Sequence, residues 1–133
     1  GDAPEAEAPA DALPPLDDEA VKAALEAGTL RHAADYLVHP QRSHRGTMAK
    51  AKAYCEKLDA EGVTNWRLPE IGELTTILKR KLIGNNVYWS DSPGDLDGKR
   101  VLAFDSYKGR VRTLKPAYSG AYAVCVRSVT PQG

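Results

Sequence analysis

Two cysteines have the most clearly defined chemistry in this sequence. Cys55 and Cys125 are 70 positions apart, and each has apolar neighbours. Cys55 falls on the apolar stripe of a predicted helix and Cys125 in a predicted late strand, so both are expected to face the core. Such a pair can form a disulfide if the two elements pack together, which would indicate an oxidising compartment. Two reduced, buried thiols are the alternative that the residues alone leave open.

The histidines and aspartates do not form a complete metal-binding pattern. The three histidines are separated by seven and five residues, a spacing that suits neither a helical ligand pair nor a compact zinc knuckle. Three aspartates before or beside Gly98 faintly resemble a calcium loop, but Lys99 and Arg100 lie where a late bidentate acid would help. The residues concerned are His32, His39 and His44, and Asp91, Asp95 and Asp97. We therefore predict no metal and no cofactor.

Charge is distributed unevenly along the chain. Residues 1–28 carry eight acids and one base, so residues 29–133 carry 17 bases and 10 acids, a net charge of +7. A basic domain favours acidic partners, although a solvated surface is the alternative.

Five residues are candidates for ligand binding. Arg110 and Arg112 share one face of a predicted strand, and Lys99 and Arg100 lie near the facing strand. Their charges suit phosphates or uronates, or alternatively protect a solvated strand. Tyr118 lies in a predicted loop and is the aromatic residue best placed to stack on a sugar.

The N-terminal part of the chain divides into a linker and a helix. Residues 1–16 are rich in Ala, Pro and acids and are predicted to be a disordered linker. Residues 17–28 are predicted to form a helix that ends at Gly28. The first residue is Gly and no signal-peptide pattern follows, so we expect a processed piece of a longer protein.

The remaining pattern predicts a single α+β domain over residues 17–133. Residues 34–38 form a short apolar run that is expected to be a strand. Helices are expected over residues 48–59, capped by Thr47, and from Pro69, which suits the first helical turn. Strands are expected over 87–90, 101–105, 110–114 and 121–127, with a hairpin turn over 106–109. Helices followed by an antiparallel meander indicate α+β.

Five short motifs follow one another in a defined order across residues 48–127. They are Ala53-Tyr54-Cys55, Trp66-Arg67-Leu68-Pro69 with Glu73-Leu74, Tyr88-Trp89-Ser90, Phe104 with Gly109-Arg110-Val111, and Cys125-Val126-Arg127. This series resembles the Lcl C-terminal domain family, a bacterial family of largely unknown function with a C-type-lectin-like fold. The resemblance implies two helices flanking a twisted antiparallel sheet and a Cys55–Cys125 disulfide. It also implies a ligand-binding loop face formed by residues 90–100 and 115–120.

The motif residues are more easily explained by structure than by function. Trp66 and Leu68 are expected in the core, with Arg67 paired to a carboxylate such as Glu73; the alternative is that Arg67 binds an anion. Tyr88 and Trp89 are likewise expected to be core residues.

No arrangement of residues points to catalysis. The Arg67-Leu68-Pro69…Glu73 element also resembles the formylglycine-generating enzyme fold. Those enzymes need a redox-active cysteine pair, whereas this chain has only Cys55 and Cys125, which are expected to have a structural role. There is no serine–histidine–aspartate order and no glycine-rich phosphate loop. We predict that the protein is not an enzyme.

The sequence therefore predicts an exported bacterial recognition module in the periplasm or at the cell surface. Its expected partner is a glycan or an envelope protein, with no nucleic acid, and with membrane contact only through an anchor upstream of residue 1. Two alternatives remain: a component of an envelope secretion, pilus or motility machine, and the ectodomain of a membrane sensor.

Overall fold

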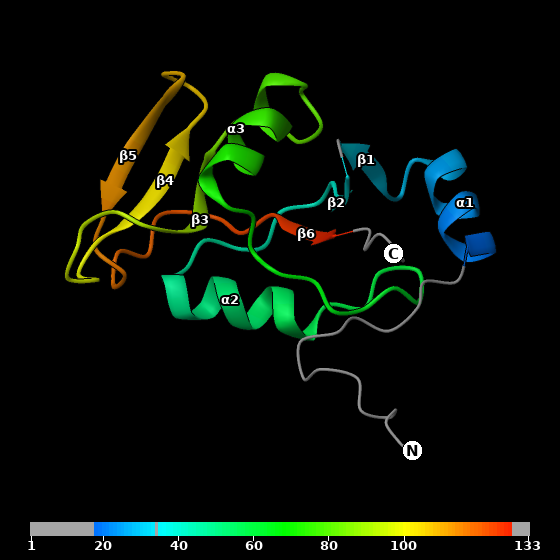
Figure 1. Ribbon diagram of the computed structural model, residues 1–133, viewed down its shortest axis with the longest axis horizontal. Coiled ribbons are helices and arrows are strands. Elements are labelled where there is room, and N and C mark those ends of the chain that lie inside the picture. Colours follow the sequence, from blue (N-terminus) through cyan, green and yellow to red (C-terminus); the bar gives the residue numbers. More distant parts are fainter. Residues whose placement is uncertain (1–17, 34, 129–133) are drawn as a thin grey trace, which may run out of the picture.

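Three helices and six strands make up the part of the chain that the computed structural model describes, residues 18–33 and 35–128 (Figure 1). The helices are α1 (Asp18–Ala27), α2 (Met48–Lys57) and α3 (Ile71–Lys79). The strands are β1 (Arg31–Ala33), β2 (Tyr36–His39), β3 (Val87–Pro93), β4 (Val101–Asp105), β5 (Arg110–Leu114) and β6 (Cys125–Ser128). The α+β prediction is confirmed, whereas the predicted linker lies outside the described residues.

The six strands form two small antiparallel sheets, with strand orders β1-β2-β6 and β3-β4-β5, and not the single sheet expected. The segment after residue 120 explains the difference. Tyr122 exchanges backbone hydrogen bonds with Val87 and Trp89 of β3, and the chain then pairs with β2 from Cys125 onward. One apolar segment thus joins the two sheets, and its alternating pattern does not reveal that it changes partners.

The helices differ from prediction mainly at their ends. Thr47 caps α2 as expected, because its hydroxyl accepts a hydrogen bond from the amide of Lys50. The helix ends at Lys57, since Leu58 already has extended backbone angles. α3 begins at Ile71 and its N-cap is Glu70, so Pro69 lies before the helix and not in its first turn. Gly28 follows α1 at φ +80° and ends it as predicted.

A hairpin near the N-terminus replaces the single short strand expected over residues 34–38. β1 pairs with β2, and Arg31 lies opposite Val38. β1 was missed because its sequence, Arg-His-Ala, is short and has two exposed polar residues. Its position nevertheless matters, because it brings Arg31 beside the end of α3.

The core consists of two hydrophobic clusters that share the segment 121–126. The first surrounds the two tryptophans and the two cysteines, and the second lies between α3 and the strands. Alternate residues of the segment enter opposite clusters, as their alternation predicts: Ala121, Ala123 and Cys125 the first, and Tyr122, Val124 and Val126 the second. α1 adds Ala24 to the first cluster.

The disulfide predicted between Cys55 and Cys125 is present. Its Cα atoms lie 5.4 Å apart, and both residues are completely buried. The bond attaches α2 to β6 and so joins elements that are separated by 70 positions in sequence. Among the described residues, no helix is long and apolar enough to cross a membrane.

Candidate functional site

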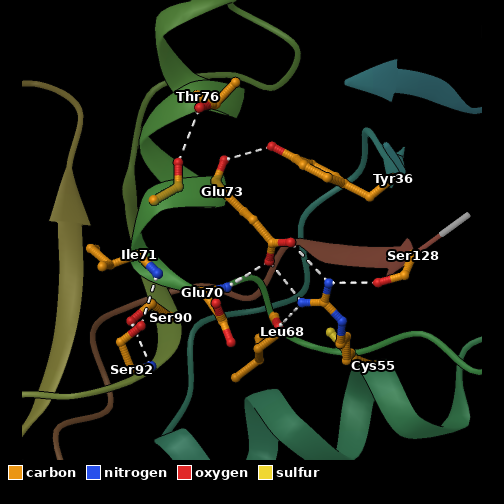
Figure 2. Close-up of polar contacts among 12 residues, drawn as sticks. Tyr36, Cys55, Leu68, Glu70, Ile71, Glu73, Thr76, Ser90, Ser92 and Ser128 are labelled. Carbon is orange, nitrogen blue, oxygen red and sulfur yellow. Dashed lines mark hydrogen bonds and ion pairs between the residues drawn. The ribbon is translucent and has the colours of Figure 1, made fainter. Parts of the chain in front are cut away.

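Arg67 and Glu73 form a two-pronged ion pair at the start of α3. The two guanidinium nitrogens of Arg67 donate hydrogen bonds of 2.8 and 2.9 Å to the two carboxylate oxygens of Glu73. The second nitrogen also donates to the Ser128 hydroxyl at 2.9 Å. Figure 2 shows Glu73 at the centre of these contacts, where its carboxylate also accepts the amide of Glu70 at 2.9 Å. The pair thus connects α3 to the end of β6.

The ionisation of Glu73 reflects this environment. Burial disfavours its charged form, but the hydrogen bonds from Arg67 and from the Glu70 amide outweigh burial, so the pKa of Glu73 is lowered. The hydrogen bond to Glu73 raises the pKa of Arg67 in turn. With both carboxylate oxygens engaged, the geometry gives this pair a structural role rather than that of a free anion-binding arginine.

The aromatic motif residues are part of the core. Trp66 and Leu68 are buried, and Tyr88 and Trp89 are completely inaccessible to solvent. The indole nitrogens donate to backbone carbonyls, Trp66 to Val63 and Trp89 to Gly46. These side chains are therefore not available to a ligand.

The four basic candidates do not lie together. In the β4–β5 pairing, Val101 is opposite Leu114 and Asp105 is opposite Arg110. Lys99 and Arg100 therefore precede one end of this hairpin, and Arg110 lies at the other end, about 13 Å away along the strands. Arg112 lies between the ends and is 3.7 Å from the buried carboxylate of Asp105.

The aspartates near Gly98 have local roles. The Asp95 carboxylate accepts the amides of Lys99 and Arg100 at 2.9 and 3.2 Å, which holds the β3–β4 loop. Asp91 instead lies 3.9 Å from the Lys52 amine. Within residues 18–33 and 35–128, no group of three or more potential metal-ligating side chains is brought together.

Tyr118 is partly exposed, at 41%, and its ring is fixed against the core. Its edge meets the buried ring of Trp89 at a centroid distance of 6.4 Å. A methyl group at Gly120 would collide with the Tyr118 hydroxyl, so the glycine is needed for this packing. Tyr118 therefore offers a positioned aromatic surface, although within the described region no hydrogen bond or ion pair joins it to any of the four basic candidates.

A large hollow of the described structure lies elsewhere, between the end of α3 and the β4–β5 turn. It is an open groove of about 790 Å³, hereafter the α3–hairpin groove. Its floor is apolar and is formed by Leu78, Leu82, Ile83 and Phe104. Ser106 and Gly109 of the hairpin turn form the facing wall, and Figure 1 shows the hairpin standing beside α3.

The rim of this groove is basic. Arg31, Lys79 and Lys81 line it, and among the described residues no carboxylate does. None of the three cations forms an ion pair with another described side chain. Lys79 lies in the last turn of α3, where cations stabilise a helix. Lys81 lies beyond the helix and Arg31 comes from β1, so the helix dipole does not account for all three.

A second hollow lies beside the end of α1. It has a volume of about 460 Å³ and is lined by the end of α1 and the residues that follow it. It shares Arg31 and Leu82 with the α3–hairpin groove. These two residues line both hollows, and the lining of the second hollow also includes one carboxylate, that of Glu26.

Sequence reasoning missed this groove because it is assembled from three distant segments, around residues 31, 78–85 and 104–109. The run Lys79-Arg80-Lys81 was the only feature of the local sequence that could have indicated the groove, and cations at the end of a helix are also explained by helix stabilisation. Of the predicted ligand-binding residues, only Arg110 is next in sequence to a groove residue, Gly109.

Comparison with known proteins does not assign this surface. No protein-family model matches the chain, and no curated protein matches it.

Proposed function

We propose that this chain is an extracytoplasmic recognition module that binds an acidic segment of an envelope protein in the α3–hairpin groove. The observation that carries the proposal is the groove itself, which combines an apolar floor with three unpaired cations and no lining carboxylate among the described residues. Residues 29–133 carry a net charge of +7, and at this groove three of their cations lie together without a lining carboxylate among the described residues. A single-sign rim favours and steers an oppositely charged partner.

The chemistry of the floor favours a polypeptide over a glycan. Leu78, Leu82 and Ile83 are aliphatic, and aliphatic floors accept apolar side chains. Sugars instead prefer flat aromatic faces surrounded by several hydrogen-bonding groups, and Phe104 is the one aromatic residue among the described residues that line the groove. An acidic peptide with leucine-like residues would satisfy both the floor and the rim.

Two further parts of the proposal concern fold family and location. A C-type-lectin-like fold related to the Lcl C-terminal domain family is supported by the order of the motifs and by the α2–β6 disulfide. A location in the periplasm or on the cell surface is supported by the same disulfide, because such bonds persist in oxidising compartments.

The proposal is tested by measuring the binding of labelled acidic peptides that contain leucine. A charge-reversal variant, K79E/K81E, should bind about tenfold more weakly, or about 1.4 kcal/mol. The matched control is K50E/K57E, which reverses two exposed lysines of α2. Equal weakening in both variants would show nonspecific attraction and overturn the assignment of the groove. Peptides with serine in place of leucine should also bind less well, because they lose contact with the floor.

A glycan-binding function at Tyr118 is the second candidate. It is favoured by the exposure of Tyr118 and by the fixed orientation of its ring against Trp89. Binding of a glycan that persists at high salt but is lost on Tyr118→Ala would support it. Unchanged glycan binding in this variant would exclude it.

A further inference from the structure

The first 17 residues have a composition complementary to the α3–hairpin groove. They contain five acids and no base: Asp2, Glu5, Glu7, Asp11 and Asp17. They also contain an apolar stretch, Leu13-Pro14-Pro15-Leu16. Acids separated by small residues and followed by leucines are what a groove with an apolar floor and a cationic rim would accept. Four prolines restrict the unbound segment, which reduces the conformational entropy lost on binding.

The segment is attached close enough to reach the groove. It joins the described structure at Asp18, the first residue of α1, and the other end of α1 lines the second hollow. A helix of 10 residues is about 15 Å long, so the attachment point lies about one helix length from that hollow. About five extended residues would span this distance, and the remaining dozen, about 40 Å long when extended, could continue past Arg31 toward Lys79 and Lys81.

We infer that residues 1–17 bind the α3–hairpin groove of the same chain, with their carboxylates facing Arg31, Lys79 and Lys81. Attachment through a short segment supplies an effective concentration on the order of millimolar. A contact with a dissociation constant of about 1 mM would then occupy the groove about half of the time and weaken an external acidic ligand about twofold. The binding needs only the groove, whereas this regulatory effect rests on the proposed function.

The test uses the full chain without any added ligand. A nitroxide spin label at Ala8→Cys should broaden the amide signals of Lys81, Ile83 and Gly109 at low salt. Signals at the end of α2, around Lys57, should keep their intensity. The broadening should disappear in K79E/K81E and at about 1 M salt, where screening acts over about 3 Å. Uniform or absent broadening, or broadening that persists in K79E/K81E, would overturn the inference.

A second variant separates this inference from the proposed function. Neutralising the five acids with Asn or Gln should abolish the broadening and strengthen the binding of an external acidic peptide about twofold. Broadening at the groove without any external peptide binding would uphold the internal contact and refute the proposed function. External binding that depends on Lys79 and Lys81, without broadening, would uphold the function and refute the internal contact.

Discussion

Individual polar residues in this protein divide into those that hold the fold and those that face outward without partners. The Arg67–Glu73 pair belongs to the first group, because each charge is satisfied by the other and by Ser128 or Glu70. Arg31, Lys79 and Lys81 belong to the second group within the described chain. The sequence identified the first group, since Arg67 and Glu73 are six residues apart and share a motif. It could not identify the second, because its three cations meet only in the folded state.

Replacement of Glu73 by Gln should lower the free energy of unfolding by about 1.5–3 kcal/mol, because it leaves Arg67 without its charged partner. Replacement of Asp91 by Asn is the matched control and should cost about 0–1 kcal/mol, since the Lys52–Asp91 side chains are 49% and 47% exposed. Urea unfolding at neutral pH compares them, and equal losses would contradict the structural role of the pair. Folding lowers the pKa of Glu73. The contribution of Glu73 to folding stability is therefore fully present at pH values above its pKa in the unfolded chain, and it is lost as the pH falls through its pKa in the folded chain.

His39 should make the fold sensitive to mild acid. Burial lowers the pKa of His39 below 6.5, so the unfolded chain binds the proton more readily than the folded chain. Stability should therefore fall as pH drops from about 6.5 toward the folded pKa. His39→Gln should flatten this part of the profile, measured as the unfolding midpoint from pH 7 to pH 5. The matched control is His44→Gln, at an exposed residue, and a slope in the His39 variant equal to that of the unsubstituted protein would contradict this assignment.

The helices and strands were predicted best where residues within or next to them in the sequence determine their ends. β4 and β5 match the expected ranges, because the turn between them contains Gly109, which adopts φ +66°. In the same way, the N-cap Thr47 allowed the start of α2 to be predicted, and Gly28 allowed the end of α1 to be predicted. The errors fall where tertiary contacts decide: β6 begins only at Cys125 because the preceding residues bind the other sheet, and β1 exists only through pairing with β2.

Two glycine substitutions should have opposite effects on stability. Gly109→Ala should destabilise the protein by about 1 kcal/mol, because an alanine is strained at positive φ even though its methyl group would have open space. Gly72→Ala, in the first turn of α3 and also with open space, should stabilise it by roughly 0.3–1 kcal/mol. Thermal unfolding of both variants checks the signs. Destabilisation by both would show that packing, and not backbone conformation, governs these positions.

At the scale of the whole molecule, the disulfide and the groove come from the same arrangement of distant segments. The disulfide could be predicted because cysteines on two inward-facing stripes have few alternatives, and the resemblance named the pairing. The groove could not, because it depends on how two sheets and the end of α3 are placed. The charge imbalance between residues 1–28 and the rest was visible in the sequence, but the surface that carries the unpaired positive charge was not.

Reduction of the disulfide should lower the free energy of unfolding by about 4 kcal/mol, because it releases the constraint of a loop spanning 70 positions in the unfolded chain. Urea unfolding with and without reductant measures this difference. Alkylation of the unfolded, unreduced chain is the control and should label neither cysteine. A reduced protein with an unchanged unfolding midpoint would show that the bond is not important for stability.

The measurement that tests the central claim most directly is a map of backbone amide chemical shifts during titration with an acidic, leucine-containing peptide. The proposed function predicts that the largest, saturable shifts fall on Arg31, on residues 78–85 and on residues 104–109. These shifts should be lost in K79E/K81E and retained in K50E/K57E. Shifts centred on Tyr118, or small shifts spread over every basic residue, would contradict the claim that the α3–hairpin groove is the ligand-binding site.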